Sequence, residues 1–513
     1  MPRVRPNILM IMADQLPAWT TGIYGHPTVQ TPNIDGLAER GVTFESAYAN
    51  CPLCGPSRAS MCTGRMGSDV GVYDNGGELS AELPTFIHHL RRAGYETLLS
   101  GKMHFVGPDQ HHGFERRLTT EIYPSSFVWT PDWRKGAYAN PGTAVDQILS
   151  AGRCDWSMQL DYDEEVHFRS LEALRDLSRR RNEDRPFFLC ASYTHPHDPF
   201  IINSPWWDMY DHDAVTMPTA PALPLAKMHQ FDQWLQIHHM VDKYPIGERE
   251  IRNARHAFYG MVSYFDAKVG ELVQELVRLG MAQDTVVIVT SDHGEMLGEH
   301  GMWFKRTYFD ESTRVPLLIS GPGVSAGARV GKTVSLIDLF PTFLELAGSP
   351  DRAEIVADLP GDSLSALLRG EDADWRDYAI GEYCGEGTCQ PMRMAVSAKL
   401  KYVFVNGEQP LLFDLAVDPH ELHNRIDDKA YAERLATLQK LVHDNWDAEG
   451  LRADVIESQT RRRYINEAMK KGLAHSWDAR PDFDAASQYV RKHDAKVTSS
   501  LMRIPKVDDS PDA

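Results

Sequence analysis

The sequence predicts an α/β fold: a large, mostly parallel sheet covered by helices on both faces. Three short apolar runs without periodicity, at 7–13, 186–193 and 285–291, are typical of strands buried on both faces. Longer amphipathic segments at 161–182 and 250–279 alternate with these runs and are typical of helices that connect parallel strands. Polar residues repeatedly follow the strand ends, and that edge of an open α/β sheet is where ligands bind.

The first hundred residues add further elements of the same kind. Thr31 followed by Pro32 is typical of a helix start, and Gly41 ends this helix. The other expected elements are a strand at 42–48, a loop that contains Cys54, a helix from 56 to 63, a helix at 83–93 and a strand at 96–100. Lys102 and His104 follow the last of these strands directly.

The pattern of the chain changes after about residue 370. Short strand-like runs at close spacing predict a small antiparallel sheet, followed by a helix; they lie at 378–383, 392–397, 401–405 and 411–415, with the helix at 430–447. From Arg452 onward the chain is polar with scattered aromatic residues. Such an extended tail either packs as an arm on a neighbouring subunit or is partly disordered, and its Trp and Tyr content favours packing. We expect a large domain at 1–370, a small subdomain at 371–450 and a tail at 451–513.

Composition limits the classes of partner. A formal net charge of −19 argues against nucleic acid and against an anionic membrane surface. Seven cysteines, an odd number, do not suggest a disulfide framework and favour a reducing compartment. The apolar run before Asp14 is too short for a signal peptide, and no segment approaches the ~20 apolar residues of a membrane span. We expect a soluble cytoplasmic protein.

The segment Cys54-Gly55-Pro56-Ser57-Arg58 matches C-x-P-S-R, a short signature that marks a cysteine for oxidation to formylglycine in the sulfatase family. The hydrated aldehyde offers one hydroxyl to attack sulfur and a second whose collapse expels sulfate, whereas an ordinary Ser or Cys would remain covalently modified. Two alternatives are an inert buried thiol and a redox pair, because Cys51 and Cys54 also form a C-x-x-C.

Three residues at strand ends are candidate metal ligands: Asp14, Asp292 and His293. Together with an oxygen from a modified residue 54 they suit one divalent cation. Gln15 offers a neutral carbonyl at best, and so small a number of carboxylates leaves the choice between Ca2+ and Mn2+ open. Each aspartate taken alone is better explained as a helix or turn cap, and it is their position on both sides of a candidate nucleophile that favours a metal site.

Cationic, imidazole and aromatic side chains complete the candidate site. Arg58, Lys102 and Lys305 would neutralise the oxygens of a sulfate or phosphate, and the apolar neighbours of both lysines argue against plain surface charges. His104, His195 and His197 are candidate proton carriers, although each is also explained as a structural histidine. Trp129 lies in a proline-flanked loop, where an exposed indole face would meet a ligand cation.

Taken together, the motifs resemble the type I, formylglycine-dependent sulfatases of the alkaline-phosphatase-like superfamily over nearly the whole chain. They read R-P-N-I-L-M-I-M-A-D-Q, C-G-P-S-R-A-S-M, G-K-M-H, T-H-P-H-D-P-F and T-S-D-H-G-E-M-L-G-E. The resemblance implies a catalytic domain over 1–370 that hydrolyses small anionic sulfate esters, matured by a formylglycine-generating enzyme.

The resemblance also implies roles for individual residues. Cys54 becomes formylglycine and joins Asp14, Asp292 and His293 around the metal ion. It further implies that Arg58 holds the hydrated aldehyde and that Lys102 and His104 stabilise the gem-diol. His197 and Lys305 would face the sulfate and the leaving-group oxygen, and His195 is a weaker candidate for the same role.

Within this family the chain is most similar to choline sulfatases, on the segments 72–75, 84–86, 101–109 and 117–131. This likeness implies that Trp129 and Glu386 surround a quaternary ammonium and that the tail builds a homo-oligomer, a dimer or tetramer. Two departures leave the leaving group open: Val497, with Asp494 nearby, stands where that group has an acidic residue, and Asp146 stands near its Asn.

Four functions are therefore compared. The first is hydrolysis of a choline-like or other small alkyl sulfate. The second is an arylsulfatase, or a phosphonate or phosphate ester hydrolase, with the same machinery, because sulfur and phosphorus oxyanions share a tetrahedral shape. The third is a thiol-disulfide protein that uses Cys51 and Cys54, and the fourth is a silent binding protein. The number of strand-end polar groups argues against the last two.

Overall fold

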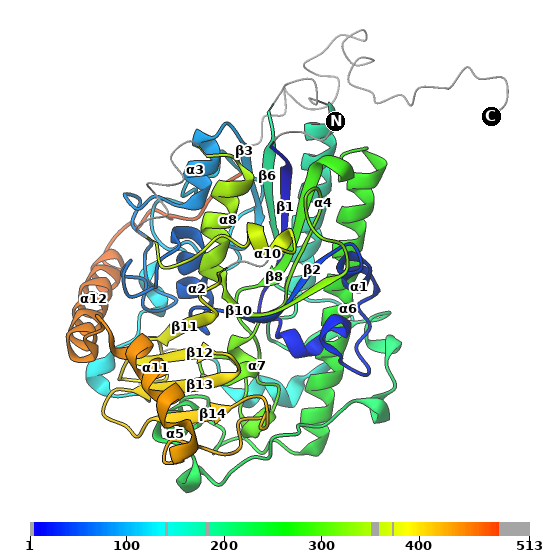
Figure 1. The fold of residues 1–513 in the computed structure, drawn as a ribbon. Helices are drawn as coiled ribbons and strands as arrows, with labels where there is room; N and C mark the ends of the chain where they lie inside the picture. Colours follow the sequence, from blue (N-terminus) through cyan, green and yellow to red (C-terminus); the bar gives the residue numbers. More distant parts are fainter. Residues whose placement is uncertain (1–4, 139–141, 180–184, 350–358, 372–373, 482–513) are drawn as a thin grey trace, which may run out of the picture.

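The computed structural model describes residues 5–138, 142–179, 185–349, 359–371 and 374–481, and its centre is an eight-stranded sheet (Figure 1). The strand order is β10-β2-β9-β8-β1-β6-β3-β4. These strands are β1 (Asn7–Ala13), β2 (Gly41–Tyr48), β3 (Glu96–Gly101), β4 (Arg116–Arg117), β6 (Phe187–Ser192), β8 (Thr285–Ser291), β9 (Leu317–Ser320) and β10 (Ala328–Ser335). Among the described strand pairings of this eight-stranded sheet, the two that involve β9 are antiparallel and the others are parallel. The predicted large, mostly parallel sheet is confirmed.

Both faces of this sheet are buried under helices, which explains the absence of polar alternation in the strands. Along β1, Leu9 and Ile11 belong to one core, and Ile8 and Met10 belong to the opposite one. The first core is covered by α1 (Pro32–Ala38), α4 (Met158–Arg179) and α6 (Glu248–Arg278), and the second by α2 (Cys54–Thr63), α3 (Phe86–Arg92) and α8 (Leu339–Leu346) (Figure 1).

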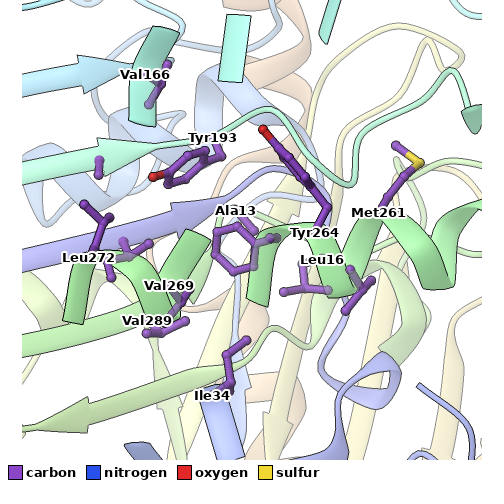
Figure 2. Packing of buried hydrophobic residues seen from close by; sticks show 14 of the residues in the cluster. Ala13, Leu16, Ile34, Val166, Tyr193, Met261, Tyr264, Val269, Leu272 and Val289 are labelled. Atoms are coloured by element: carbon purple, nitrogen blue, oxygen red, sulfur yellow. The ribbon is translucent and has the colours of Figure 1, made fainter. Parts of the chain in front are cut away.

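Helix α6 fixes the carboxyl ends of two central strands. Figure 2 shows Tyr264, Val269 and Leu272 on the side of α6 that faces the sheet, with Ala13 of β1 and Val289 of β8 in the same cluster. All five side chains are essentially fully buried. Burying a side chain of this size contributes about 1.5–3 kcal/mol, so the strand ends are held firmly where the polar loops begin.

The second sheet is small and antiparallel, as predicted, with the order β11-β12-β13-β14. Its strands are β11 (Tyr378–Tyr383), β12 (Met392–Ser397), β13 (Leu400–Val405) and β14 (Leu411–Asp414), and α11 (Ala432–His443) packs on it. A third core joins this sheet to the segment that precedes α2, including Cys51 and Leu53. The edge strand β11 also accepts a hydrogen bond of 2.8 Å from Asn50 at the carbonyl of Ile380.

The irregular tail expected from Arg452 begins later, because residues Ala448–Met469 form helix α12. Its buried stripe consists of Leu451, Val455, Gln459 and Arg462. Two of these four residues are polar, so the stripe has almost no hydrophobic periodicity to detect. In its described part the helix lies against its own chain (Figure 1).

Other boundaries differ by a few residues. Cys54 is the first residue of α2 and does not lie in a loop. Helix α3 begins at Phe86 because Thr85 and His88 form a capping box. The sequence did not suggest β4, β9, β10 or α8. It also did not suggest β5 (Gly152–Cys154), β7 (Ile201–Asn203), α5 (Gln230–His238), α7 (Asp310–Thr313) or α10 (Ser365–Leu368). Within the described ranges no helix is both long and apolar enough to cross a membrane.

Candidate active site

Adjacent parallel strands bring the predicted metal ligands together. Ala13 of β1 pairs with Ser291 of β8, so the residues that follow them, Asp14 and Asp292, leave the sheet side by side. One ligating atom each from Asp14, Cys54, Asp292 and His293 lies within 4.8 Å of the other three, and all four residues are buried. The positions that the sequence separates by more than two hundred residues form one cluster.

The thiol of Cys54 lies at the centre of this cluster. Its Sγ is 3.1 Å from Nε2 of His293 and 3.7 Å from Oδ1 of Asp14. Burial alone would raise the pKa of the Cys54 thiol, but Lys102, Lys305 and His293 together hold that pKa well below its usual value. The surroundings of residue 54 therefore favour an anionic group.

The donor set fits a divalent cation. Nδ1 of His293 faces the carbonyl of Gly294 at 3.0 Å and keeps a ring proton, so Nε2 is the nitrogen that, once deprotonated, would face a cation in the cluster. Burial and the neighbouring Asp292 raise the pKa of Asp14, and this shift outweighs the opposing effect of Lys102. Two carboxylates, an imidazole and an oxygen from a modified residue 54 suit a cation of the Ca2+ or Mn2+ class.

Arg58 and Lys102 are buried at this cluster and are not surface charges. Nε of Arg58 donates to Oδ2 of Asp292 at 2.8 Å, and its Nη1 donates to the carbonyl of Lys102 at 2.6 Å and to Ser192 at 2.9 Å. Nζ of Lys102 contacts a carboxylate oxygen of Asp14, and both of these side chains are fully buried. Although burial disfavours a charged guanidinium, Asp292 and Asp14 raise the pKa of Arg58.

Lys305 and His197 form a second polar group beside the first. Nζ of Lys305 lies 2.6 Å from Nε2 of His197 and also contacts the side-chain oxygen of Gln15. Nε2 of Gln15 donates to Asp198 at 3.1 Å. Gln15 occurs at the turn that follows β1, with φ of 69°. Its backbone nitrogen donates to Asp292 at 3.1 Å while its side chain contacts Lys305 and Asp198, so it connects the Asp14–Asp292 cluster to this second group.

The rings of His104, Tyr123 and Trp129 lie against one another and form an aromatic wall beside the cluster. The ring of His104 lies 5.7 Å from Trp129 and 5.6 Å from Tyr123, and the last two rings are 5.0 Å apart. Nζ of Lys102 lies 4.4 Å from the Tyr123 ring centre, and the Tyr123 hydroxyl is 3.3 Å from Nδ1 of His197. Trp129 is half-buried and its ring contacts those of Tyr123 and His104.

Two of the predicted residues have partners of their own away from the cluster. His195 is buried, with Nδ1 2.6 Å from Asp163 and its ring 4.6 Å from that of Tyr264. Glu386 is paired with Arg306 at 2.8 Å. Asp146 is exposed, whereas Asp494 and Val497 lie outside the described residues.

The geometry also bears on the thiol-disulfide alternative. All seven cysteines lie in the described part of the chain and are free. Burial and Glu382 raise the pKa of Cys51 well above its ordinary value, opposite to the shift at Cys54. These environments suit one reactive position and do not suit a dithiol.

Sequence reasoning missed three residues of the site, which are Asn75, Tyr123 and Asp198. Oδ1 of Asn75 accepts a hydrogen bond of 2.9 Å from the backbone nitrogen of Gly55, next to Cys54. Asp198 stands beside His197 inside T-H-P-H-D-P-F, so the motif itself contained the signal. Neither Asn75 nor Tyr123 has a local pattern that distinguishes it from a loop residue.

Comparison with known proteins agrees with this geometry. The family model described as "Sulfatase" matches residues 6–349, "N-sulphoglucosamine sulphohydrolase, C-terminal" matches 298–447, and "Choline sulfatase enzyme C terminal" matches 453–496. The chain is 39% identical to a choline-sulfatase of Rhizobium meliloti, covering 95% of this chain and 96% of that protein. It is 31% identical to an arylsulfatase of Clostridium perfringens, covering 86% and 94%.

A solved structure supports the same conclusion. The phosphonate monoester hydrolase of Agrobacterium radiobacter superposes with a TM-score of 0.68 at 26% identity, covering 88% of this chain and 96% of that one. A model match over more than half of the chain, together with relatives that align along most of their length, establishes the group to which this protein belongs. The chain is a member of the sulfatase family of sulfuric ester hydrolases.

Proposed function

We propose that this chain hydrolyses small sulfate esters with formylglycine at position 54 and one divalent cation. The observation that carries the proposal is the buried cluster in which Cys54, Asp14, Asp292 and His293 place their ligating atoms within 4.8 Å of one another. Cys54 lies in the first turn of α2 and inside the C-x-P-S-R signature, at the position that is modified in this family.

When present, formylglycine supplies a hydroxyl nucleophile and the cation supplies positive charge for the sulfate oxygens. The rest is done by the chain itself. Arg58 and Lys102, both buried on the metal-ligand carboxylates, hold fixed positive charge beside residue 54. His104 donates from Nε2 to the carbonyl of Asn75 at 3.1 Å and its side chain also hydrogen-bonds with residue 54, so its other ring nitrogen, Nδ1, is suited to move a proton of the hydrated aldehyde.

Lys305 and His197 serve the leaving group in this proposal. Their mutual distance of 2.6 Å and their contact with Gln15 and Asp198 hold the Lys305 ammonium beside the cluster. A proton at Nζ is available for the oxygen that departs from sulfur. Protonation at that step is worth most for an alcohol, which is a poor leaving group as an anion.

The leaving group that we favour is a choline-like alcohol. The similarity to the Rhizobium meliloti choline-sulfatase and to the choline sulfatase C-terminal model supports it, and so do the adjacent rings of Trp129 and Tyr123. One contact favours the second candidate, an aryl sulfate or a phosphonate ester. The Glu386 carboxylate is already paired with Arg306, which reduces the negative charge it offers to an ammonium.

We further propose a cytoplasmic location, supported by the seven free cysteines, and maturation by a formylglycine-generating enzyme. The division into a catalytic domain at 1–370, a subdomain at 371–450 and a C-terminal region at 451–513 is proposed from the two separate sheets. Assembly into a dimer or tetramer through the C-terminal region remains part of the proposal, to be tested by native mass measurement.

The function is tested by combining peptide mass spectrometry around residue 54 with a substrate panel. The panel pairs choline sulfate, a neutral alkyl sulfate, an aryl sulfate and an aryl phosphonate. Preparations that contain more formylglycine are expected to hydrolyse the sulfates in proportion. Converted protein that hydrolyses only the phosphonate would support the second candidate, and converted, metal-loaded protein that hydrolyses none of the four would reject the proposal.

A further inference from the structure

Helix α12 carries Arg462, whose buried guanidinium pairs with Asp74, a residue from the first hundred of the chain. Nη1 and Nη2 of Arg462 each lie 2.7 Å from one carboxylate oxygen of Asp74, a bidentate pair. The Arg462 side chain is 7% exposed and that of Asp74 is fully buried. A buried pair of this kind is often no more stabilising than a well-packed apolar pair, so stability alone does not account for it.

Asp74 begins a tight turn. Its Oδ1 also accepts from the backbone nitrogen of Gly76 at 2.9 Å, and its carbonyl accepts from that of Gly77 at 2.9 Å. With both carboxylate oxygens engaged, the side chain has one orientation. The arginine therefore fixes the geometry of residues 74–77 from outside the turn.

The next residue of this turn, Asn75, contacts two parts of the active site. Its Oδ1 accepts from the backbone nitrogen of Gly55 at 2.9 Å, which fixes the first turn of α2 beside Cys54. Its carbonyl oxygen lies 3.1 Å from Nε2 of His104. Arg462 is thus connected to the backbone next to the nucleophile position by its hydrogen bonds to Asp74, by the peptide bond between Asp74 and Asn75, and by the hydrogen bond from Gly55 to Asn75.

The same helix supports the aromatic wall and the loop of Glu386. Nη1 of Arg462 is 3.1 Å from the hydroxyl of Thr130, the residue after Trp129. One turn earlier, the side-chain oxygen of Gln459 accepts from the backbone nitrogen of Trp133 at 2.9 Å. The indole nitrogen of Trp133 in turn donates to the carbonyl of Gly385 at 2.9 Å.

We infer that Arg462 is a positioning residue of the sulfatase site, through which the C-terminal helix orients the active site of its own chain. It sets the turn of Asp74, and this turn sets Gly55 and His104 relative to residue 54. The inference rests on the proposed function for its kinetic consequence. The geometric consequence, that Arg462 fixes the turn of residues 74–77, does not depend on that function.

The test compares Arg462→Met with the matched control Arg461→Ala in full-length protein. Arg461 is the preceding residue of α12 and pairs with Glu457 at the surface. Because misplacing reacting groups by about 1 Å is enough to cost ~100-fold, kcat per formylglycine is expected to fall about 10- to 100-fold in Arg462→Met. KM should change less than about threefold, since the turn acts on the reacting groups. The control should keep both values.

A second pair of variants separates positioning from charge compensation. Arg462→Met combined with Asp74→Asn leaves no buried charge without a partner, so this double variant keeps a folded chain testable if Arg462→Met alone unfolds. The kcat of the double variant is expected to stay low. Arg462→Lys keeps the positive charge but loses the two-pronged guanidinium contact, so its kcat should be higher than that of Arg462→Met and lower than that of the parent. A folded Arg462→Met or double variant with kcat within about twofold of the parent overturns the inference.

Hydrogen exchange supplies a readout that does not need activity. Amides of residues 54–57 and 74–77 should exchange faster in Arg462→Met, or in the double variant, than in Arg461→Ala. Equal exchange overturns the inference, even if the parent chain hydrolyses no substrate of the panel. If the parent is active and only the variant comparison fails, the proposed function stands and the role of Arg462 is rejected.

Discussion

Nζ of Lys305 lies 2.6 Å from Nε2 of His197, so the two side chains share a hydrogen bond. An ammonium only donates, so Nε2 accepts and the ring proton is on Nδ1, which faces the carbonyl of Asp198 at 2.7 Å. Gln15 and Asp198 hold this pair at the edge of the cluster. One proton, on Nζ, is thereby directed toward the position beside residue 54.

The substitution Lys305→Ala should therefore have an effect that depends on the leaving group. We expect kcat to fall about 100-fold or more for an alkyl sulfate, because alkoxide needs a proton as it departs. An aryl sulfate with an acidic phenol should lose less than about tenfold. Steady-state kinetics over a series of leaving groups measures this slope. An equal loss across the series would assign Lys305 to sulfate binding alone.

The substitution Cys54→Ala should abolish turnover and leave the fold intact. The side chain is small and buried at a helix start, so its loss changes packing little, whereas residue 54 is the proposed nucleophile. We expect kcat to fall at least about a thousandfold, with an unchanged circular dichroism spectrum. Cys62→Ala, eight residues along the same helix, is the matched control and should retain activity. Hydrolysis at normal rates by Cys54→Ala would reject the nucleophile assignment.

Removal of metal should inactivate the enzyme and lower its thermal stability. Two carboxylates and an imidazole converge in a fully buried cluster, and a cation that binds there stabilises only the folded state. At one hundred times its Kd, Ca2+ or Mn2+ is expected to add about 2.7 kcal/mol, seen as a higher Tm after chelator treatment and reloading. Asp292→Asn should remove most of this gain. A Tm that does not respond to either ion in the parent chain would contradict the metal assignment.

The substitution Trp129→Ala should discriminate between cationic and neutral substrates. Its half-buried indole lies against Tyr123 and His104, where a ring face is available to an ammonium. We expect KM for choline sulfate to rise about tenfold, in line with a cation–π contact of 1–2 kcal/mol, while KM for a neutral aryl sulfate changes little. Val128→Ala, at the exposed neighbouring position, is the control. Equal effects on both substrates would mean that the ring is structural.

The substitution Asp232→Asn should change how stability depends on pH. Burial raises the pKa of Asp232 from 3.8 to about 7, although the Tyr308 hydroxyl, which donates at 2.6 Å, opposes this shift. Between these two values the folded chain keeps a proton that the unfolded chain loses, so the free energy of unfolding falls as pH rises through this range.

Because asparagine carries no such proton, the variant should be more stable than the parent at pH 8, by on the order of 2 kcal/mol, and similar near pH 4. Chemical denaturation at several pH values measures the difference. Asp444→Asn, on the surface, is the control and should follow the parent. A constant difference between Asp232→Asn and the parent at all pH values would contradict the buried, protonated carboxyl.

The central sheet and the meeting of Asp14 with Asp292 follow from local sequence patterns. Strands such as β1 and β8 are covered on both faces, so their apolar runs are continuous, and the charges that end them mark the edge of the sheet. Asp14 and Asp292 could be placed in one site for this reason. The family signature around Cys54 supplied the chemistry that spacing alone leaves open.

The support of the site could not be predicted in the same way. Arg462 and Asp74 are 388 residues apart, and each is an ordinary charged residue in its own segment. Asn75 gains its significance only from the backbone of Gly55, which the tertiary fold brings to it. Because α12 buries a stripe that is half polar, neither its helical character nor its contact surface appears as a hydrophobic period.

The side chain of Cys54 is 1% exposed in the folded chain, enclosed by the start of α2 and by the loops at the sheet edge. No second enzyme can bring its own catalytic groups to a sulfur atom in that position. The proposed oxidation of this thiol would therefore have to take place between synthesis on the ribosome and closure of the core. Under that proposal, the share of active molecules in a cell would depend on how fast the chain folds relative to its modification, and slower translation or a more abundant modifying enzyme would raise that share.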